Sequence, residues 1–193
     1  MNIGVFGASS SRLEPQFFDA AAEMGALLAK RGHTVVFGGG QDGLMGACAI
    51  SAKENGGSIL GIAPRFFDEP GFLLKSCDTF LFTETMAGRK ELMVAKSEAF
   101  LVLPGGIGTM DEFFEVITLK QLGKASGPIV LLNTAGFYDP LYAFLSAMAE
   151  GGFMSVRCLE LLRLCAKPEE AMAALEREDP LTGDIFRLEN YAK

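Results

Sequence analysis

The feature that most constrains this fold is an alternation of short apolar runs with segments of helical periodicity. Helices are predicted at 15–30, 43–55, 86–97, 109–122 and 139–150, where apolar residues recur at intervals of three and four. The runs predicted to form buried strands are NIGVFGA at 2–8, TVVFGG at 34–39, SILGIA at 58–63, TFLFT at 79–83, AFLVLPG at 99–105 and PIVLLN at 128–133. This order predicts an α/β fold, in which helices cover both faces of a parallel sheet and right-handed crossovers join the strands.

The length of 193 residues fits one domain, and we expect residues 1–193 to form it. Residues 64–78 interrupt the alternation with two prolines and three phenylalanines, which suggests an excursion over the carboxyl edge of the sheet, with a lid as one interpretation of it. Beyond about Val156 we expect a short apolar run and then a helix from Pro168. The residues from Arg177 onward are polar and are expected to form a tail.

Composition excludes several classes of partner and site. A net charge of -7 argues against nucleic acid or an anionic membrane surface as the main partner. No window approaches the roughly 20 apolar residues of a membrane span, and the start of the chain has no export signal, so a cytoplasmic location is predicted. The four cysteines form no C-x-x-C pair, and the one histidine, His33, is expected to be structural. No metal and no cofactor is therefore predicted.

Three of the predicted strands end in glycine. The turns are GASSS after the first strand, GGGQDGLMG after the second and PGGIGT after the fifth. Glycine after a strand lets peptide N–H groups converge on an anion at the start of the next helix, where the helix dipole favours negative charge. Because the carboxyl ends of parallel strands share one edge, the three turns predict a common pocket for an anionic small molecule.

The second turn, GGGQDG, satisfies the dinucleotide pattern G-x-G-x-x-G, but its context argues against such a ligand. A dinucleotide site needs an acidic residue at the end of the following strand, and this strand ends in Ala63, Pro64 and Arg65. No glycine turn continues into Gly-Lys-Ser or Gly-Lys-Thr, so the pattern that binds triphosphates is absent too. A monophosphate is favoured, while a plain tight turn remains the alternative for this motif.

The turn before the fourth predicted helix allows two interpretations. Thr109 and Glu112 fit T-x-x-E, the pattern of a capping box, in which the two side chains satisfy free amides at the helix start. Capping does not explain why Gly105, Gly106 and Gly108 precede it. A phosphate on the amides of residues 106–109 would explain the glycines, with the Thr109 hydroxyl contributing and Glu112 directed toward the rest of the ligand.

Arg89 and Lys90 stand at the start of a predicted helix, where the dipole disfavours cations. They are either solvated surface residues or the partners of an anion or of an acidic residue such as Glu112.

Together these motifs resemble the Lonely Guy family, the cytokinin-activating phosphoribohydrolases that were long labelled lysine decarboxylases. PGGIGTMDE at 104–112 matches its P-G-G-x-G-T-x-x-E motif, GGGQDGLMG at 38–46 its G-G-G-x-x-G-L-M-G turn, and MAGRKELM at 86–93 its M-x-x-R-K-x-x-M segment. The resemblance implies a Rossmann-like homodimer that hydrolyses the N-glycosidic bond of adenosine-type 5′-monophosphates to the free base and ribose 5-phosphate. Met93, Phe113 and Phe114 are candidate apolar anchors of the dimer contact, with packing in the core as the alternative. The segment 64–78 is longer and more aromatic than in typical plant members, which leaves the preferred base open.

By position in these motifs, the resemblance implies Arg89 and Glu112 as the catalytic pair. The substrate-binding residues that it implies are Gly39, Gly40, Gly43, Met86, Lys90, Gly105, Gly106, Ile107, Gly108, Thr109 and Glu115. Cleavage of a ribosyl C–N bond passes through an oxocarbenium-like state that needs a nearby carboxylate, which suits Glu112. Fold likeness alone does not separate an enzyme from a nucleotide or cofactor carrier of the same superfamily, so a non-hydrolytic carrier is the alternative. Lysine decarboxylation is disfavoured because nothing supplies the setting of a pyridoxal phosphate Schiff base.

Overall fold

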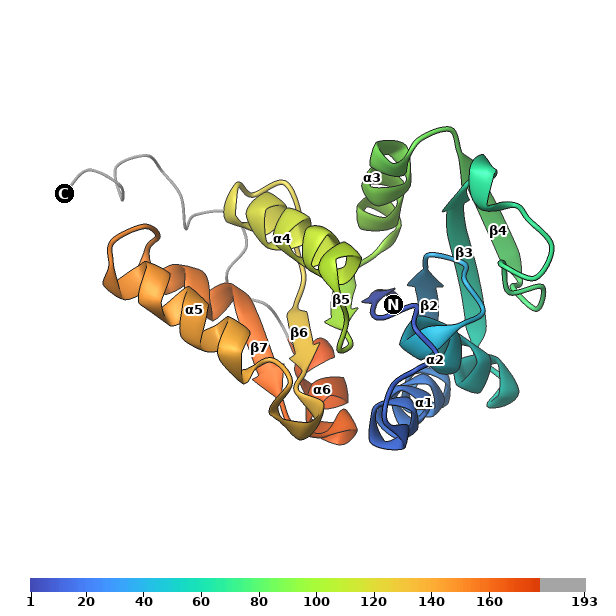
Figure 1. Ribbon diagram of the computed structural model, residues 1–193, viewed down its shortest axis with the longest axis horizontal. Helices are drawn as coiled ribbons and strands as arrows, with labels where there is room; N and C mark the ends of the chain where they lie inside the picture. Colours follow the sequence, from blue (N-terminus) through green and yellow to red (C-terminus); the bar gives the residue numbers. More distant parts are fainter. Residues whose placement is uncertain (178–193) are drawn as a thin grey trace.

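The computed structural model describes residues 1–177 and places seven parallel strands in one sheet (Figure 1). The strands are β1 Asn2–Phe6, β2 Thr34–Phe37, β3 Ser58–Pro64, β4 Thr79–Thr83, β5 Ala99–Val102, β6 Ile129–Leu132 and β7 Leu162–Cys165. Their order across the sheet is β4-β3-β2-β1-β5-β6-β7, and every neighbouring pair is parallel. The chain therefore runs outward from β1 in one direction and then, from β5, in the other. In such sheets ligands bind where the direction reverses, between β1 and β5.

Six helices cover the sheet in two layers. They are α1 Pro15–Lys30, α2 Gly43–Glu54, α3 Met86–Lys96, α4 Ile107–Gln121, α5 Asp139–Glu150 and α6 Pro168–Leu175. The helices α1, α2 and α6 lie on one face and α3, α4 and α5 on the other (Figure 1). This arrangement confirms the predicted α/β fold with helices on both faces of a parallel sheet.

The two faces explain why the inner strands β5 and β6 are apolar and buried throughout. In β5, Leu101 belongs to the core beneath α1 and α2, whereas Phe100 and Val102 belong to the core beneath α3 and α4. Successive side chains of a strand point to opposite faces, so a strand covered on both sides has no solvent-facing position. The residues predicted as anchors between two copies, Phe113 and Met93, lie in the second of these cores and are fully buried. Core packing therefore accounts for both side chains.

Predicted and observed bounds differ mainly at the glycines. The strands predicted to reach residues 8, 39 and 105 end at Phe6, Phe37 and Val102, because the glycine-containing tails are the turns themselves. The expected run beyond Val156 contains β7, and α6 begins at Pro168 as predicted. The polar tail beyond Arg177, and with it the extent of the domain over 1–193, lies outside the described residues and stays a prediction.

The edge of the sheet opposite the glycine turns contains His33, as expected for a structural residue. Its side chain is buried between the amino group of Met1, 3.2 Å from Nδ1, and the carboxylate of Glu176, 3.1 Å from Nε2. All four cysteines are free thiols. Among the described residues no helix has the length and apolarity that a membrane span requires.

Candidate functional site

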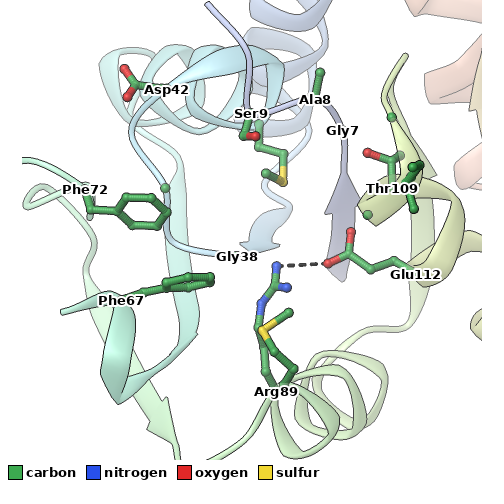
Figure 2. Close-up of a pocket in the computed structure, with 16 residues that line it drawn as sticks. Gly7, Ala8, Ser9, Gly38, Asp42, Phe67, Phe72, Arg89, Thr109 and Glu112 are labelled. Atoms are coloured by element: carbon green, nitrogen blue, oxygen red, sulfur yellow. Dashed lines mark ion pairs between the residues drawn. The ribbon is translucent and has the colours of Figure 1, made fainter. Parts of the chain in front are cut away.

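The three glycine turns meet at a cavity of about 500 Å³ beyond the carboxyl ends of β1, β2 and β5 (Figure 2). The residues that line it are Gly7, Ala8, Ser9, Gly38, Gly40, Asp42, Met45, Phe67, Phe72, Met86, Arg89, Gly106, Ile107, Gly108, Thr109 and Glu112. The shared pocket predicted from the sequence is thus present at the reversal point of the sheet. Its walls come from segments that are up to about a hundred residues apart in the chain.

The turn after β5 supplies a helix N-terminus to this cavity. Gly106 is the N-cap of α4, and the first intrahelical contact there runs from the Met110 amide to the Gly106 carbonyl, at 3.0 Å. The first amides of a helix have no acceptor within it, so those of Ile107, Gly108 and Thr109 are available to an anion. A Cβ atom at residue 106 or 108 would meet nothing within 4 Å. These two glycines leave the cavity side of the turn open.

Thr109 lies inside the helix, so the capping-box interpretation is wrong. The helix begins at Ile107, two residues before the predicted start, because the extended residue that precedes it is Gly106. Thr109 is buried, and its side chain packs on Gly105, where a Cβ atom would overlap with the Thr109 hydroxyl. The lack of a side chain at residue 105 therefore makes room for Thr109, while the Glu112 carboxylate pairs with Arg89.

Arg89 of α3 and Glu112 of α4 form a buried ion pair across the cavity floor (Figure 2). Nη2 of Arg89 lies 2.9 Å from Oε1 of Glu112, and each side chain is 8% exposed. The Nε of Arg89 donates to the carbonyl of Ile62 at 3.3 Å. A Cβ atom at residue 38 would overlap with the same guanidinium, so Gly38 makes room for it. Of the two interpretations of Arg89, the acidic partner is confirmed and the solvated surface is wrong.

The surroundings of Glu112 set its protonation. Burial raises the pKa of the Glu112 carboxyl above its usual value, and the charge of Asp111 raises it further, while Arg89 and Lys90 oppose the shift. The net direction is upward, so the protonated form of Glu112 is more favoured here than in an exposed carboxyl. A carboxyl with a raised pKa beside a cation in a cavity is a typical arrangement of an acid–base site.

Lys90 and Glu115, both predicted to bind substrate, pair with each other beside the cavity and do not line it. The Nζ of Lys90 lies 2.8 Å from Glu115 and 2.9 Å from Asp111. Hydrogen bonding to Glu115, followed by that to Asp111, raises the pKa of Lys90. The charge of Lys90 thus compensates those of Asp111 and Glu115, the two carboxylates near Glu112 on α4. The prediction that Lys90 is the partner of an acidic residue is also confirmed.

The glycines predicted in the turn after β2 divide between two uses. Gly40 lines the cavity, and a Cβ atom there would meet nothing within 4 Å. Gly39, with φ of 79°, packs on the ring of Phe80, and Gly43, with φ of 69°, packs on the carbonyl of Ala8. Positive φ and close neighbours both require glycine at these two positions. The tight-turn alternative therefore holds for Gly39 and Gly43.

The other predicted binding residues are placed as follows. Met86, Gly106, Ile107, Gly108 and Thr109 line the cavity, and Gly105 lies behind Thr109. Sequence reasoning did not name the lining residues Gly7, Ala8, Ser9, Gly38, Asp42, Met45, Phe67 and Phe72 as site residues. For Gly7, Ala8 and Ser9 the signal was the GASSS turn, and for the two phenylalanines it was the excursion at 64–78.

The excursion lies over the carboxyl edge, as predicted. It is hydrogen-bonded to the turn after β2: the Gln41 amide donates to the Phe72 carbonyl at 3.1 Å, and the Leu74 amide donates to the Gly39 carbonyl at 2.8 Å. Gly40 and Leu73 form an antiparallel bridge between these segments. Phe67 and Phe72 thereby form one wall of the cavity. Among the described residues no group of three or more His, Cys, Asp or Glu side chains is placed to hold a metal ion.

Comparison with known proteins gives consistent similarities. The model of a family described as possible lysine decarboxylase matches residues 45–175. A cytokinin riboside 5′-monophosphate phosphoribohydrolase of Mycobacterium tuberculosis is 36% identical over 86% of this chain and 89% of that protein. One of Arabidopsis thaliana is 35% identical over 95% of this chain and 86% of its own length. The molybdenum cofactor carrier protein of Chlamydomonas reinhardtii, 24% identical, superimposes with a TM-score of 0.70 over 91% of this chain and 95% of the other.

Proposed function

This chain belongs to the Lonely Guy family of phosphoribohydrolases, and from that premise we propose that it hydrolyses the N-glycosidic bond of adenosine-type 5′-monophosphates. The products are the free base and ribose 5-phosphate. The enzyme is a hydrolase of N-glycosyl bonds, and cytokinin riboside 5′-monophosphates are the substrates that its relatives' names indicate.

The observation that carries this proposal is the position of the Arg89–Glu112 pair relative to the start of α4. Glu112 lies on the same helix as Gly106 and Gly108, and both the carboxylate and the helix N-terminus face one cavity (Figure 2). A 5′-phosphate on the amides of residues 107–109 brings the attached ribose toward Glu112. Anchoring the phosphate thus supplies orientation for the reaction at C1′.

In the proposed reaction, the bond between C1′ and the base nitrogen breaks and its electron pair leaves with the base. Water adds its oxygen to C1′, and its proton balances the charge on the departing base. Glu112 orients this water and stabilises the positive charge that develops on the ribose. Arg89 holds Glu112 in place through the 2.9 Å ion pair and is close enough to the cavity to stabilise the leaving base.

A non-hydrolytic carrier is the alternative that the fold leaves open. The molybdenum cofactor carrier shares the fold at 24% identity, and such a likeness concerns the fold alone. The phosphoribohydrolases at 35 and 36% identity favour the enzyme, as does a buried acid–base pair in the cavity.

Substitution of Glu112 tests this proposal. We expect Glu112→Gln to reduce the turnover of AMP and isopentenyladenosine 5′-monophosphate by about 10³-fold or more, since the amide cannot act as a base. Released base is measured by chromatography, and ribose 5-phosphate affinity, expected to change less than about threefold, is measured by calorimetry.

Asp111→Asn is the matched control, because it removes one charge from an exposed position next to Glu112. It is expected to keep turnover within about fivefold of the parent enzyme. Full activity of Glu112→Gln would show that Glu112 has no catalytic role. Return of both nucleotides intact by the parent enzyme would favour the carrier.

We propose in addition that the enzyme is a homodimer, as the family resemblance implies, and that it is cytoplasmic, as predicted from the sequence pattern. Of the three anchors expected at a dimer contact, Phe114 is 37% exposed on α4 and remains available. Sedimentation analysis of the full chain tests this, with Phe114→Glu as the variant that should weaken association.

A further inference from the structure

The wall of the cavity opposite α4 is aromatic, and the proposed reaction has not yet given it a role. Phe67 and Phe72 come from the excursion at residues 64–78, and their ring centroids are 4.8 Å apart with an interplanar angle of 31°. Phe72 is 45% exposed and Phe67 is half-buried. Aromatic side chains that face an open cavity leave apolar area uncovered. A planar ligand that stacks on them would bury this area, so such a wall is typical of a binding surface.

We infer that Phe67 and Phe72 form the stacking surface for the base of the nucleotide; this inference rests on the proposed function. Figure 2 shows the geometry: Thr109 and Glu112 lie on one side of the cavity, Phe67 and Phe72 on the other, and the Arg89 guanidinium between them. In a nucleoside 5′-monophosphate the phosphate and the base leave opposite ends of the ribose. With the phosphate at α4 and the ribose at Glu112, the base reaches the aromatic wall.

The side chains near this wall favour stacking over reading of the base edge. Within the described residues, the charged side chains that line the cavity are Arg89, Glu112 and Asp42. The first two are paired with each other, and the Asp42 carboxylate points away from the pair in Figure 2. Met45 and Met86 add apolar lining. Stacking strengthens with ring area, so this wall should bind purines in preference to pyrimidines. Stacking also tolerates substituents, so purines with an apolar group on N6 should bind as well.

The aromatic wall is also placed firmly relative to the rest of the site. The Gly40–Leu73 bridge and the two backbone hydrogen bonds beside it connect the excursion to the turn that contains Gly38. That turn packs against the Arg89 guanidinium. The stacking surface and the catalytic pair are therefore parts of one continuous structure, which is what orientation of a base over the reacting C1′ requires.

Two substitutions and a matched control test the inference. Phe67→Ala and Phe72→Ala should each weaken AMP binding about tenfold, which is the loss expected for about 1.4 kcal/mol of stacking. Phe144→Ala is the control, because Phe144 lies on α5, is 60% exposed and does not line the cavity. It should change affinity less than twofold. Phe72→Trp should restore AMP binding, since it restores the aromatic face.

The probes are chosen to separate base binding from everything else. Calorimetry with AMP and CMP, carried out in the Glu112→Gln background so that AMP is not hydrolysed, measures the preference for the larger ring, which the two alanine substitutions should reduce. Ribose 5-phosphate, which has no base, should bind the parent protein and both variants equally, within about twofold. Unchanged AMP affinity in both variants, or an equal loss for ribose 5-phosphate, would overturn the inference.

These binding measurements do not depend on turnover. If the parent protein binds AMP without cleaving it and the alanine variants lose that binding selectively, the stacking surface stands and the hydrolase proposal fails. If AMP is cleaved and its KM is the same in both variants, the hydrolase stands and the stacking surface is refuted.

Discussion

The glycine-rich turn after β2 and the one after β5 look alike in the sequence, yet their glycines have different neighbours. In the first turn, three glycines, Gly38, Gly39 and Gly43, lie against Arg89, Phe80 and Ala8, so protein atoms occupy the space where side chains would be, while Gly40 faces the cavity. In the second turn the proportion is reversed: Gly106 and Gly108 have open space on the side of the cavity, and Gly105 packs on Thr109. The comparison teaches that glycine can allow close packing within the chain or leave room for a ligand, and that only the neighbours tell which.

The largest effect is expected in the packed turn. Gly43→Ala should lower the free energy of unfolding by about 3 kcal/mol or more, because φ is 69° and the Cβ atom would overlap with the backbone of Ala8. Urea denaturation measures the loss. Gly56→Ala is the control: its φ is 79° but nothing lies within 4 Å, so it should cost only about 1 kcal/mol. Equal losses in the two variants would break the comparison.

Gly38→Ala should act on catalysis more than on folding. The new methyl group would overlap with the flexible end of Arg89, which can shift at little cost in stability. Displacing the guanidinium by about 1 Å is expected to lower kcat about 10²-fold, with the melting temperature changed by only a few degrees. Steady-state kinetics and thermal denaturation on the same preparation provide both values. If Gly38→Ala kept the kcat of the parent enzyme, the position of the Arg89 guanidinium would not matter for catalysis.

In the turn after β5, Gly108→Ala should raise stability and weaken ligand binding, whereas Gly43→Ala should lower stability. Residue 108 lies in the first turn of α4 with room for a methyl group, so alanine should raise stability by about 0.5 kcal/mol or more. The same methyl group would stand where a phosphate approaches, and affinity for ribose 5-phosphate should fall about tenfold. Calorimetry decides: a gain in stability with unchanged affinity would show that no phosphate binds at this turn.

The smallest effect is expected from removing the positive charge of Lys90, which lies near Glu112. Lys90 lowers the pKa of Glu112 against the larger effect of burial, so Lys90→Met should raise that pKa further. If ionised Glu112 is the active form, activity is lost as pH falls through its pKa, and the acid limb of the kcat/KM profile should move to higher pH. An unmoved limb would assign that titration to another group.

The sequence predicted the elements of the fold and the meeting of the three turns, since apolar periodicity and strand direction depend on local patterns. It also suggested Arg89 and Glu112 as partners, because a cation at a helix start needs a compensating contact. The placement of Thr109 was wrong, since a start two residues earlier turns a cap into a buried helical residue. Bounds of helices are least determined where several residues can serve as the N-cap.

Other features depend on contacts that no local pattern encodes. Gly39 and Gly43 face Phe80 and Ala8, which come from other strands and turns, so a motif cannot show that these glycines pack within the chain. Phe67 and Phe72 were noticed only as part of an unusual segment. Their place on the cavity wall results from the pairing of Leu73 with Gly40, a contact between residues 33 positions apart.

The bridge between Gly40 and Leu73 links events at the two ends of the cavity. The bridge joins the excursion to the turn in which Gly38 packs against the Arg89 guanidinium, so a base stacked on the excursion and the catalytic pair would share one support. Poorly fitting bases should consequently turn over slowly even at saturation, because part of their binding energy no longer aligns the reacting groups. Selectivity in this enzyme would then be expressed in the rate of bond cleavage as well as in occupancy.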